Sequence, residues 1–278
     1  MALSVIDVYR TLLPKTNCGD CGHSTCLAFA SMVVSRKTPL SLCPHIDPEK
    51  LSAAQAELEV QHAAGKWTQR DMAEDALRWA RERAASMAVE DLPGRIGGRL
   101  LSESAEPLLE LPYFDGAVHI GPGGMNHADG RPLNRWEQVF LYNHMAQGGS
   151  REPTGNWKGF NEFPNTVSKV KSMKAHVEDP LVKRFRGRVE ALAAAAQAAG
   201  GRQLTDGEVA ADVCAVFRPL PRVPVMLLFW DAEPDEGYEA GAKLLFDETA
   251  PEHLDIESLL FLSERIRQLL CGEEGADG

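Results

Sequence analysis

Apolar residues recur at helical spacing through the first third of the chain, and turn residues separate the runs. Pro14 and Pro39 end two of these runs, since a proline cannot continue a helix. Asp47 and Pro48 have the order of an N-cap followed by a proline in the first turn. The pattern therefore predicts four helices, over residues 3–12, 26–37, 48–64 and 68–89.

The remainder mixes strand and helix patterns. Strands are expected at 108–111 and 117–120, joined through a turn at Asp115 and Gly116. The run Val223–Trp230 is apolar on both faces, which predicts a central strand. Further strands are expected at 211–217 and 242–246, and helices at 133–146, 165–177, 180–199 and 255–270.

These elements predict an α+β protein, in which a small helical domain precedes a larger domain with a mainly antiparallel sheet packed by helices. We expect the small domain at residues 1–46, a helical linker at 47–91, and the α+β domain at 92–278. A length of 278 residues fits one large or two ordinary domains.

Composition and charge narrow the function classes. The net charge of −11 and the pI of 5.2 argue against nucleic-acid binding, which needs a basic footprint. No apolar run is long enough to span a bilayer, and no basic region followed by an apolar core marks a secretory signal. We therefore expect a cytoplasmic protein, whose thiols stay reduced.

Four of the six cysteines form the pattern C-x2-C-x4-C-x16-C: Cys18, Cys21, Cys26 and Cys43. Clustered thiolates are typical of zinc or iron–sulfur sites. A structural zinc site usually has two C-x2-C knuckles or a histidine pair, and no histidine follows at such a spacing. Pro44 follows the fourth cysteine, as in bacterial ferredoxins. The spacing thus favours an iron–sulfur cluster, with zinc and disulfides as the alternatives.

Two glycines support a tight wrap of chain around that site. Gly19 and Gly22 allow left-handed backbone, so that the loop can curl and aim N–H groups at sulfur. Lys15, Asn17 and His23 are candidates to contact the cysteine ligands from outside.

The stretch from Tyr9 to Pro44 resembles the small four-cysteine domain that opens the large subunit of the corrinoid iron–sulfur protein. A similar module occurs in electron-transport subunits of Rnf-type complexes. The residues that carry the resemblance are Leu12–Gly19, Cys21, Gly22, Thr25–Ala30, Cys43 and Pro44. It implies that Cys18, Cys21, Cys26 and Cys43 ligate one [4Fe-4S] cluster. The remainder resembles an uncharacterised domain of anaerobic bacteria, which implies no activity.

Two functions follow as hypotheses. In the first, the chain is a one-electron redox component of anaerobic one-carbon or corrinoid-related metabolism, and its partner is a redox protein or a small-molecule or corrinoid ligand. In the second, residues 92–278 form an enzyme or a small-molecule binder, and the cluster is its sensor or internal electron source. The aromatic residues that could line its pocket, or simply fill the core, are Trp136, Trp157, Phe160 and Trp230.

Other chemistry-bearing residues have weaker patterns. The stretch Gly121–Gly130 is expected to be a flexible loop. Its segment Gly121–Gly124 lacks the lysine and hydroxyl residue of a P-loop, so we expect a mobile turn there. His119, His127 and His144 could form a metal or acid–base set, but they lack H-x-x-x-H spacing. Cys214 and Cys271 are expected to be packing residues. A solvated acidic turn is expected at Asp231, Glu233, Asp235 and Glu236, and a solvated basic stretch at Lys169, Lys171, Lys174, Lys183, Arg184, Arg186 and Arg188.

Overall fold

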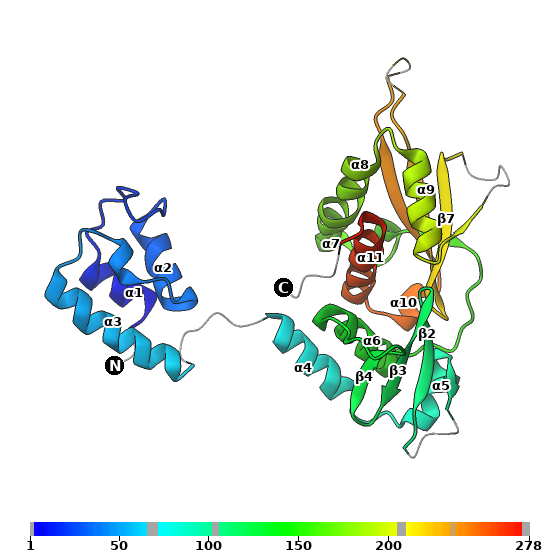
Figure 1. Ribbon diagram of the computed structural model, residues 1–278, viewed down its shortest axis with the longest axis horizontal. Helices are drawn as coiled ribbons and strands as arrows, with labels where there is room; N and C mark the ends of the chain where they lie inside the picture. Colours follow the sequence, from blue (N-terminus) through cyan, green and yellow to red (C-terminus); the bar gives the residue numbers. More distant parts are fainter. Residues whose placement is uncertain are drawn as a thin grey trace. The chain divides into compact units, whose positions relative to one another are not determined.

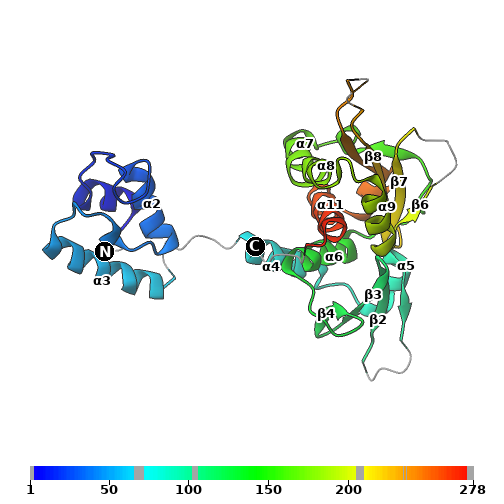
Figure 2. The same ribbon diagram turned by 45° about the horizontal axis from the view of Figure 1, so that its top comes forward.

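The computed structural model describes residues 3–65, 72–101, 106–204, 210–233, 235 and 237–273. The chain divides into two compact units, an N-terminal unit (Met1–Met72) and a C-terminal unit (Ala73–Gly278). Figures 1 and 2 show a helical N-terminal unit and a C-terminal unit that contains sheets and helices. This order confirms the predicted α+β class.

The N-terminal unit begins with a short helix α1 (Val5–Asp7), which continues as a π-turn η1 (Val8–Leu12). Helix α2 (Cys26–Arg36), the 3₁₀ turn η2 (Leu40–Leu42) and helix α3 (Pro48–Ala63) follow. Each helix starts at a side-chain cap, because Ser4, Thr25 and Asp47 accept hydrogen bonds from backbone N–H groups of the first turn. The three helices predicted here are confirmed.

The Ala- and Glu-rich composition of residues 48–64 suggests an exposed linker helix. In the structure, α3 packs against the rest of the N-terminal unit. Ala54 and Leu58 join the buried cluster that contains Phe29. The buried Gln61 accepts a hydrogen bond from the backbone N–H of Leu3 at 2.7 Å and donates one to the carbonyl of the same residue at 3.0 Å. These contacts tie the last turn of α3 to the start of the chain.

Helix α4 (Met72–Ala84) packs in the C-terminal unit, where Leu77 and Ala80 contact Val139. The two helices predicted for the linker 47–91 are thus divided between the two units, and the three-part division stays a prediction. The helix predicted at 68–89 is too long at its C-terminal end, because a 3₁₀ turn η3 (Val89–Asp91) and a short helix α5 (Leu92–Ile96) follow. Its predicted start lies outside the described residues.

The C-terminal unit contains two antiparallel sheets. The first has the order β1-β2-β3-β4 and comprises β1 (Arg99–Leu100), β2 (Leu109–Tyr113), β3 (Gly116–Gly121) and β4 (Gly124–His127). The second has the order β5-β9-β8-β7-β6 and comprises β5 (Trp157–Gly159), β6 (Arg202–Gln203), β7 (Val213–Leu220), β8 (Val223–Trp230) and β9 (Gly241–Asp247). The central place predicted for Val223–Trp230 is confirmed.

One prediction in the first sheet is wrong. The stretch Gly121–Gly130 was expected to be a loop, but β3 continues to Gly121 and turns directly into β4, with Gly121 opposite Gly124. The buried side chain of Met125 contributes to the core, and this burial overrides the low strand propensity of the surrounding glycines.

The remaining helices are α6 (Arg135–Gln147), α7 (Val167–Met173), α8 (Asp179–Phe185), α9 (Val189–Ala198), α10 (Ala250–His253) and α11 (Ile256–Cys271). A π-turn η5 (Lys174–Glu178) joins α7 to α8 without a break. The single helix predicted at 180–199 is therefore wrong. Pro180 is tolerated in the first turn of α8, whereas Gly187, with φ +69°, ends the run before α9.

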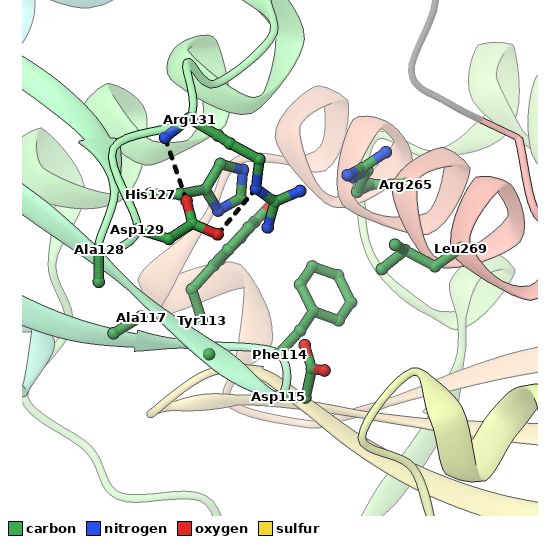
Figure 3. Close-up of a pocket in the computed structure, with 11 residues that line it drawn as sticks. Tyr113, Phe114, Asp115, Ala117, His127, Ala128, Asp129, Arg131, Arg265 and Leu269 are labelled. Atoms are coloured by element: carbon green, nitrogen blue, oxygen red, sulfur yellow. Dashed lines mark hydrogen bonds and ion pairs between the residues drawn. The ribbon is translucent and has the colours of Figure 1, made fainter.

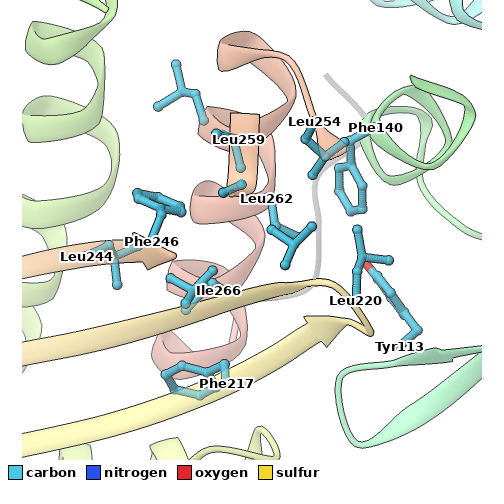
Figure 4. Packing of buried hydrophobic residues seen from close by; sticks show 14 of the residues in the cluster. Tyr113, Phe140, Phe217, Leu220, Leu244, Phe246, Leu254, Leu259, Leu262 and Ile266 are labelled. Atoms are coloured by element: carbon cyan, nitrogen blue, oxygen red, sulfur yellow. The ribbon is translucent and has the colours of Figure 1, made fainter. Parts of the chain in front are cut away.

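Helix α11 lies at the centre of the C-terminal core. Its residues Leu262 and Ile266 pack among Phe217 and Phe246 of the second sheet, and Figure 4 shows Tyr113 and Phe140 in the same packing. One continuous apolar core therefore holds both sheets and the helices of this unit. It also fixes the position of α11, whose C-terminal half carries Arg265 and Leu269.

Candidate metal centre

The cysteine-rich loop lies between η1 and α2 and has an unusual backbone. Lys15, Asn17, Gly19 and Gly22 have positive φ angles of 64°, 51°, 83° and 80°. The N–H of Gly22 donates to the carbonyl of Gly19 at 2.8 Å, which closes a tight turn around Cys21. The curl predicted from the two glycines is confirmed.

Asn17 joins this loop to the next helix. Its side-chain Oδ1 accepts a hydrogen bond of 2.8 Å from the backbone N–H of Cys26, the first residue of α2. Thr25 caps the same helix by accepting from the N–H of Ala28 at 3.1 Å. Cys26 is thereby held at the start of a rigid helix.

Cys43 returns to the site after α2. Lys37 ends that helix in the left-handed conformation, with φ 58°, and the turn η2 follows. The N–H of Cys43 donates to the carbonyl of Leu40 at 3.1 Å. Helix α2 and the turn η2 thus return the chain from Cys26 to Cys43.

The Cys43 thiol lies close enough to the other three cysteines of the pattern to interact with their charges. Burial raises the pKa of the Cys43 thiol, and a hydrogen bond from the backbone N–H of His45 lowers it. The negative charges of Cys21, Cys26 and Cys18 raise that pKa further. Such mutual repulsion among thiolates is what a bound cation relieves.

The thiols differ in exposure. Cys26 and Cys43 are each 6% exposed, Cys21 is half-buried, and Cys18 is exposed. All six cysteines are free thiols, so the structure contains no disulfide among its cysteines. The site therefore has one protein-covered side and one side open to solvent.

Asp20 and His45 are neighbours of the site that the sequence did not reveal. Nε2 of His45 lies 2.6 Å from Oδ2 of Asp20, and hydrogen bonds from His45 and from Cys18 lower the pKa of that carboxyl group. Within the described residues, Cys18, Asp20 and His45 bring three possible ligand atoms within 4.8 Å of one another. His45 was not among the residues predicted to contact the cysteine site.

The other candidates around the cysteines behave differently. Asn17 makes the hydrogen bond described above, whereas the ring of His23 packs on Phe29, with 5.4 Å between the ring centres. Lys15 is exposed and contributes a positive φ to the loop. Of the three residues, Asn17 has a direct contact with a cysteine residue.

Each of the two units matches a family of known proteins. Residues 88–268 match the family described as "Domain of unknown function (DUF3786)". The chain belongs to this family. Residues 13–45 match a second family, described as "Putative Fe-S cluster". The DUF3786 chain therefore carries an iron–sulfur module ahead of its family domain.

Similar proteins share the cysteine-rich segment. The segment is 49% identical over 53 residues to the acetyl-CoA decarbonylase/synthase complex subunit gamma of Methanopyrus kandleri, covering 19% of this chain and 11% of the relative. It is 46% identical over 59 residues to the corrinoid/iron-sulfur protein large subunit of Moorella thermoacetica, covering 20% and 13%. The DUF3786 chain thus spans about a tenth of the length of these curated relatives. No solved structure matches the chain.

These matches support an iron–sulfur role for the N-terminal unit and confirm the resemblance on which the prediction rested. Within the part of the chain that the structure describes, no helix has the length and apolar character needed to cross a bilayer.

The three histidines of the DUF3786 domain do not form one set. His119 lies opposite Asn126 and His127 opposite Val118 in the register of β3 and β4, so the two histidines project from opposite faces. Nε2 of His119 lies 3.3 Å from Glu110, while His144 is fully buried and bonds the carbonyl of His253 at 3.0 Å. The metal or acid–base set considered from the sequence is wrong.

The aromatic residues considered for a pocket are also dispersed. Trp136 packs on Phe261, with 4.4 Å between ring centres, and Phe160 lies in the main core near Phe246. Trp157 and Trp230 join a separate cluster with Cys214. Their interpretation as packing residues is supported.

The two remaining cysteines, the acidic turn and the basic stretch make structural contacts in the described part of the chain. Burial raises the pKa of both the Cys214 and the Cys271 thiols, which makes them less reactive. Asp231 accepts hydrogen bonds from the N–H of Gly187 at 2.8 and 3.0 Å, and Glu236 lies outside the described residues. In the basic stretch, Lys169, Lys174 and Arg186 each pair with a carboxylate.

Proposed function

We propose that Cys18, Cys21, Cys26 and Cys43 hold one [4Fe-4S] cluster, and that the chain is a cytoplasmic one-electron redox component. The observation that carries this proposal is the placement of four free cysteines on one curled loop, the start of α2 and the end of the turn η2, in a segment that matches an Fe-S family. When bound, such a cluster supplies single-electron oxidation and reduction.

The residues present fit that group. Thiolates are the soft ligands that iron–sulfur clusters take from proteins. Burial and then the charges of the other three thiols raise the pKa of Cys43, and an iron-bearing group bound there would offset that repulsion. The backbone N–H of His45 donates to the Cys43 sulfur, which is the kind of contact that tunes a cluster's potential.

The protein shields one side of the cysteine site from solvent and leaves the other side exposed. Cys26 and Cys43 are embedded in the cluster of buried residues that contains Phe29 and Leu40, which excludes water from their side. Cys18 is exposed, and Leu27 and Leu42, next to two of the cysteines, are also exposed. A redox partner would approach from this open side.

The metabolic setting is part of the proposal. The relatives that share the segment are named as subunits of an acetyl-CoA decarbonylase/synthase complex and of a corrinoid/iron-sulfur protein. We infer from these names a role in anaerobic one-carbon or corrinoid-related metabolism, with a protein or corrinoid partner.

The test is anaerobic purification of the full chain, followed by iron and acid-labile sulfide analysis and EPR of the reduced protein. We expect about four iron and four sulfide per chain and the signal of one reduced cubane. One zinc per chain without sulfide would contradict the proposal, and Cys18, Asp20 and His45 would then be the residues to examine.

The alternative, a ligand-binding or enzymatic DUF3786 domain with the cluster as its sensor or electron source, has support from one cavity in the C-terminal unit. That cavity is independent of the cysteines, because all its lining residues belong to the C-terminal unit.

A further inference from the structure

A cavity of about 240 Å³ lies in the C-terminal unit, where the turn between β2 and β3, the segment after β4 and helix α11 meet (Figure 3). Its volume is slightly below the range of drug-sized ligand pockets, so it suits a small molecule. The residues that give it chemical character are Tyr113, Phe114, His127, Arg131, Arg265 and Leu269.

Arg131 enters the cavity from the segment after β4. Its Nε lies 2.8 Å from Oδ2 of Asp129, and its backbone N–H donates to Oδ1 of the same residue at 3.0 Å. The carboxylate thus holds the guanidinium at its Nε edge and leaves the Nη groups for another acceptor. Figure 3 shows this guanidinium extending between His127 and Arg265.

Arg265 lines the cavity from α11, and its side chain contacts a buried carboxylate. Its side chain is 16% exposed, and its Nε lies 2.8 Å from Oε1 of the buried Glu137. The same oxygen accepts a hydrogen bond of 2.8 Å from the hydroxyl of Tyr113, and Oε2 accepts one of 2.9 Å from the backbone N–H of Asn134. Each guanidinium therefore lies beside a carboxylate, Asp129 for Arg131 and Glu137 for Arg265, from two separate parts of the chain.

Phe114 forms an aromatic wall of the same cavity. It has φ +51°, a conformation that favours glycine and is rare for a bulky residue. Its N–H donates to the carbonyl of Pro219 at 3.2 Å, and its ring meets the Tyr113 ring edge-on, with 4.8 Å between centres. Strained residues of this kind gather at ligand sites, where the surroundings over-determine them.

The charge balance of the lining disfavours a multiply charged anion. Asp129 and Glu137 already offset the two guanidinium charges, and Asp115 adds another carboxylate to the lining. A multiply charged phosphate would meet these acidic groups, whereas a single planar carboxylate matches the fork of a guanidinium. Phe114 and Leu269 supply apolar surface for the rest of such a ligand.

We propose that this cavity binds a small aromatic carboxylate, with the carboxylate between Arg131 and Arg265 and the ring against Phe114. Nothing in this proposal depends on the cluster, so it can fail or succeed whatever metal the cysteines hold.

The test measures binding of benzoate to the full chain by ligand-observed NMR and calorimetry, with benzamide and inorganic phosphate as comparison probes. For so small a ligand we expect a Kd on the order of 1 mM. Benzamide and phosphate should each bind at least about tenfold more weakly, because one lacks the charge and the other the ring. Absence of saturable benzoate binding at about 10 mM, or equal binding of benzamide or phosphate, would overturn the proposal.

Matched variants locate the site. Arg131→Gln should weaken benzoate binding about tenfold or more, whereas Arg99→Gln should leave it unchanged. Arg99 is a close control, since both arginines have side chains 72% exposed and each pairs with one carboxylate. Phe114→Gly suits the positive φ and removes the ring. Acetate, which lacks a ring, should bind the parent chain more weakly than benzoate does, and Phe114→Gly should abolish that difference. Equal effects of Arg131→Gln and Arg99→Gln would show that benzoate binds elsewhere.

Discussion

The backbone N–H of Cys26 donates a hydrogen bond of 2.8 Å to the side-chain Oδ1 of Asn17. Asn17 also has φ +51°, a conformation that asparagine tolerates better than most residues. One side chain thus fixes both the curl of the cysteine loop and the position of the third cysteine. This explains why a cluster loop would need asparagine directly before Cys18.

Substitutions of Asn17 separate these two roles. Asn17→Gly keeps the positive φ but loses the hydrogen bond, at a cost of about 1 kcal/mol. Asn17→Ala also forces an alanine into left-handed backbone, which costs roughly a further 1 kcal/mol. Iron release to a chelator should therefore be faster in Asn17→Gly than in the parent chain and fastest in Asn17→Ala. Equal release rates for all three chains would contradict this role.

The cysteine variants should differ among themselves. Cys43→Ser is expected to leave a three-cysteine site that holds a [3Fe-4S] or a labile four-iron cluster, because its three partners share one loop and helix start. Cys21→Ser should lose more iron, since it removes a thiol from inside the tight turn between Gly19 and Gly22. Iron per chain and EPR measure both effects.

Cys214→Ser and Cys271→Ser are the controls for that series. Cys214 lies in β7, and Cys271 is the last residue of α11. Both variants should retain the iron content of the parent chain. If Cys214→Ser lost the iron while Cys43→Ser kept it, the ligand assignment would be wrong.

The buried His144 should make the folded chain less stable at acidic pH. Burial lowers its pKa from 6.5 to about 4, so the folded chain keeps it neutral while the unfolded chain takes up a proton. The unfolded state binds more protons between these two values, and the free energy of unfolding must therefore fall as the pH drops from 6.5 towards 4. The full effect of the shift is about 3 kcal/mol, and it is absent above pH 6.5.

Urea denaturation at pH 7 and pH 4.5 tests this effect. His144→Gln should lower the free energy of unfolding at pH 7, because it disturbs a buried site, yet show a smaller fall between the two pH values. A residual fall is expected from His253, whose pKa burial also lowers. Parallel pH dependences of the two chains would show that His144 does not titrate as described.

The buried pair of Glu137 and Arg265 predicts a strong stability effect. Glu137→Gln leaves the Arg265 guanidinium without its counter-charge, which should lower the free energy of unfolding by about 3 kcal/mol. Glu110→Gln breaks the more exposed pair with Arg99 and should cost less than about 1 kcal/mol. Thermal and urea unfolding of both variants give the comparison, and similar losses would contradict the difference in burial.

Local signals allowed much of the fold to be predicted. Asp47 and Pro48 mark a helix start because the Asp47 side chain satisfies N–H groups within the next few residues. The hairpin of β2 and β3 and the apolar run of β8 are likewise short-range patterns. The hairpin turn falls at Phe114 and Asp115, one residue before the predicted Asp115 and Gly116, because Tyr113 pairs with Gly116. The cysteine site could be predicted for the same reason, since most of its proposed ligands and its glycines lie in one short segment.

Features that depend on distant contacts could not be predicted. Burial of Met125 turns a glycine-rich stretch into a strand, and no neighbouring residue signals that burial. His45 reaches Asp20 because α2 and η2 return the chain, and Arg265 lines the same cavity as Arg131 because α11 packs through the core. In each case the feature arises from tertiary packing, and no local sequence pattern marks the residues involved.

The order of the second sheet also bears on how the chain avoids aggregation. Strand β8 is a continuous apolar segment, and alone it would be a strong template for pairing with other chains. It is enclosed between β7 and β9, and the sheet ends in the short strands β5 and β6, of three and two residues. Short edge strands offer few unpaired backbone groups to another molecule. Substitutions that weaken the pairing of β7 or β9 should therefore reduce soluble yield before they alter either binding site.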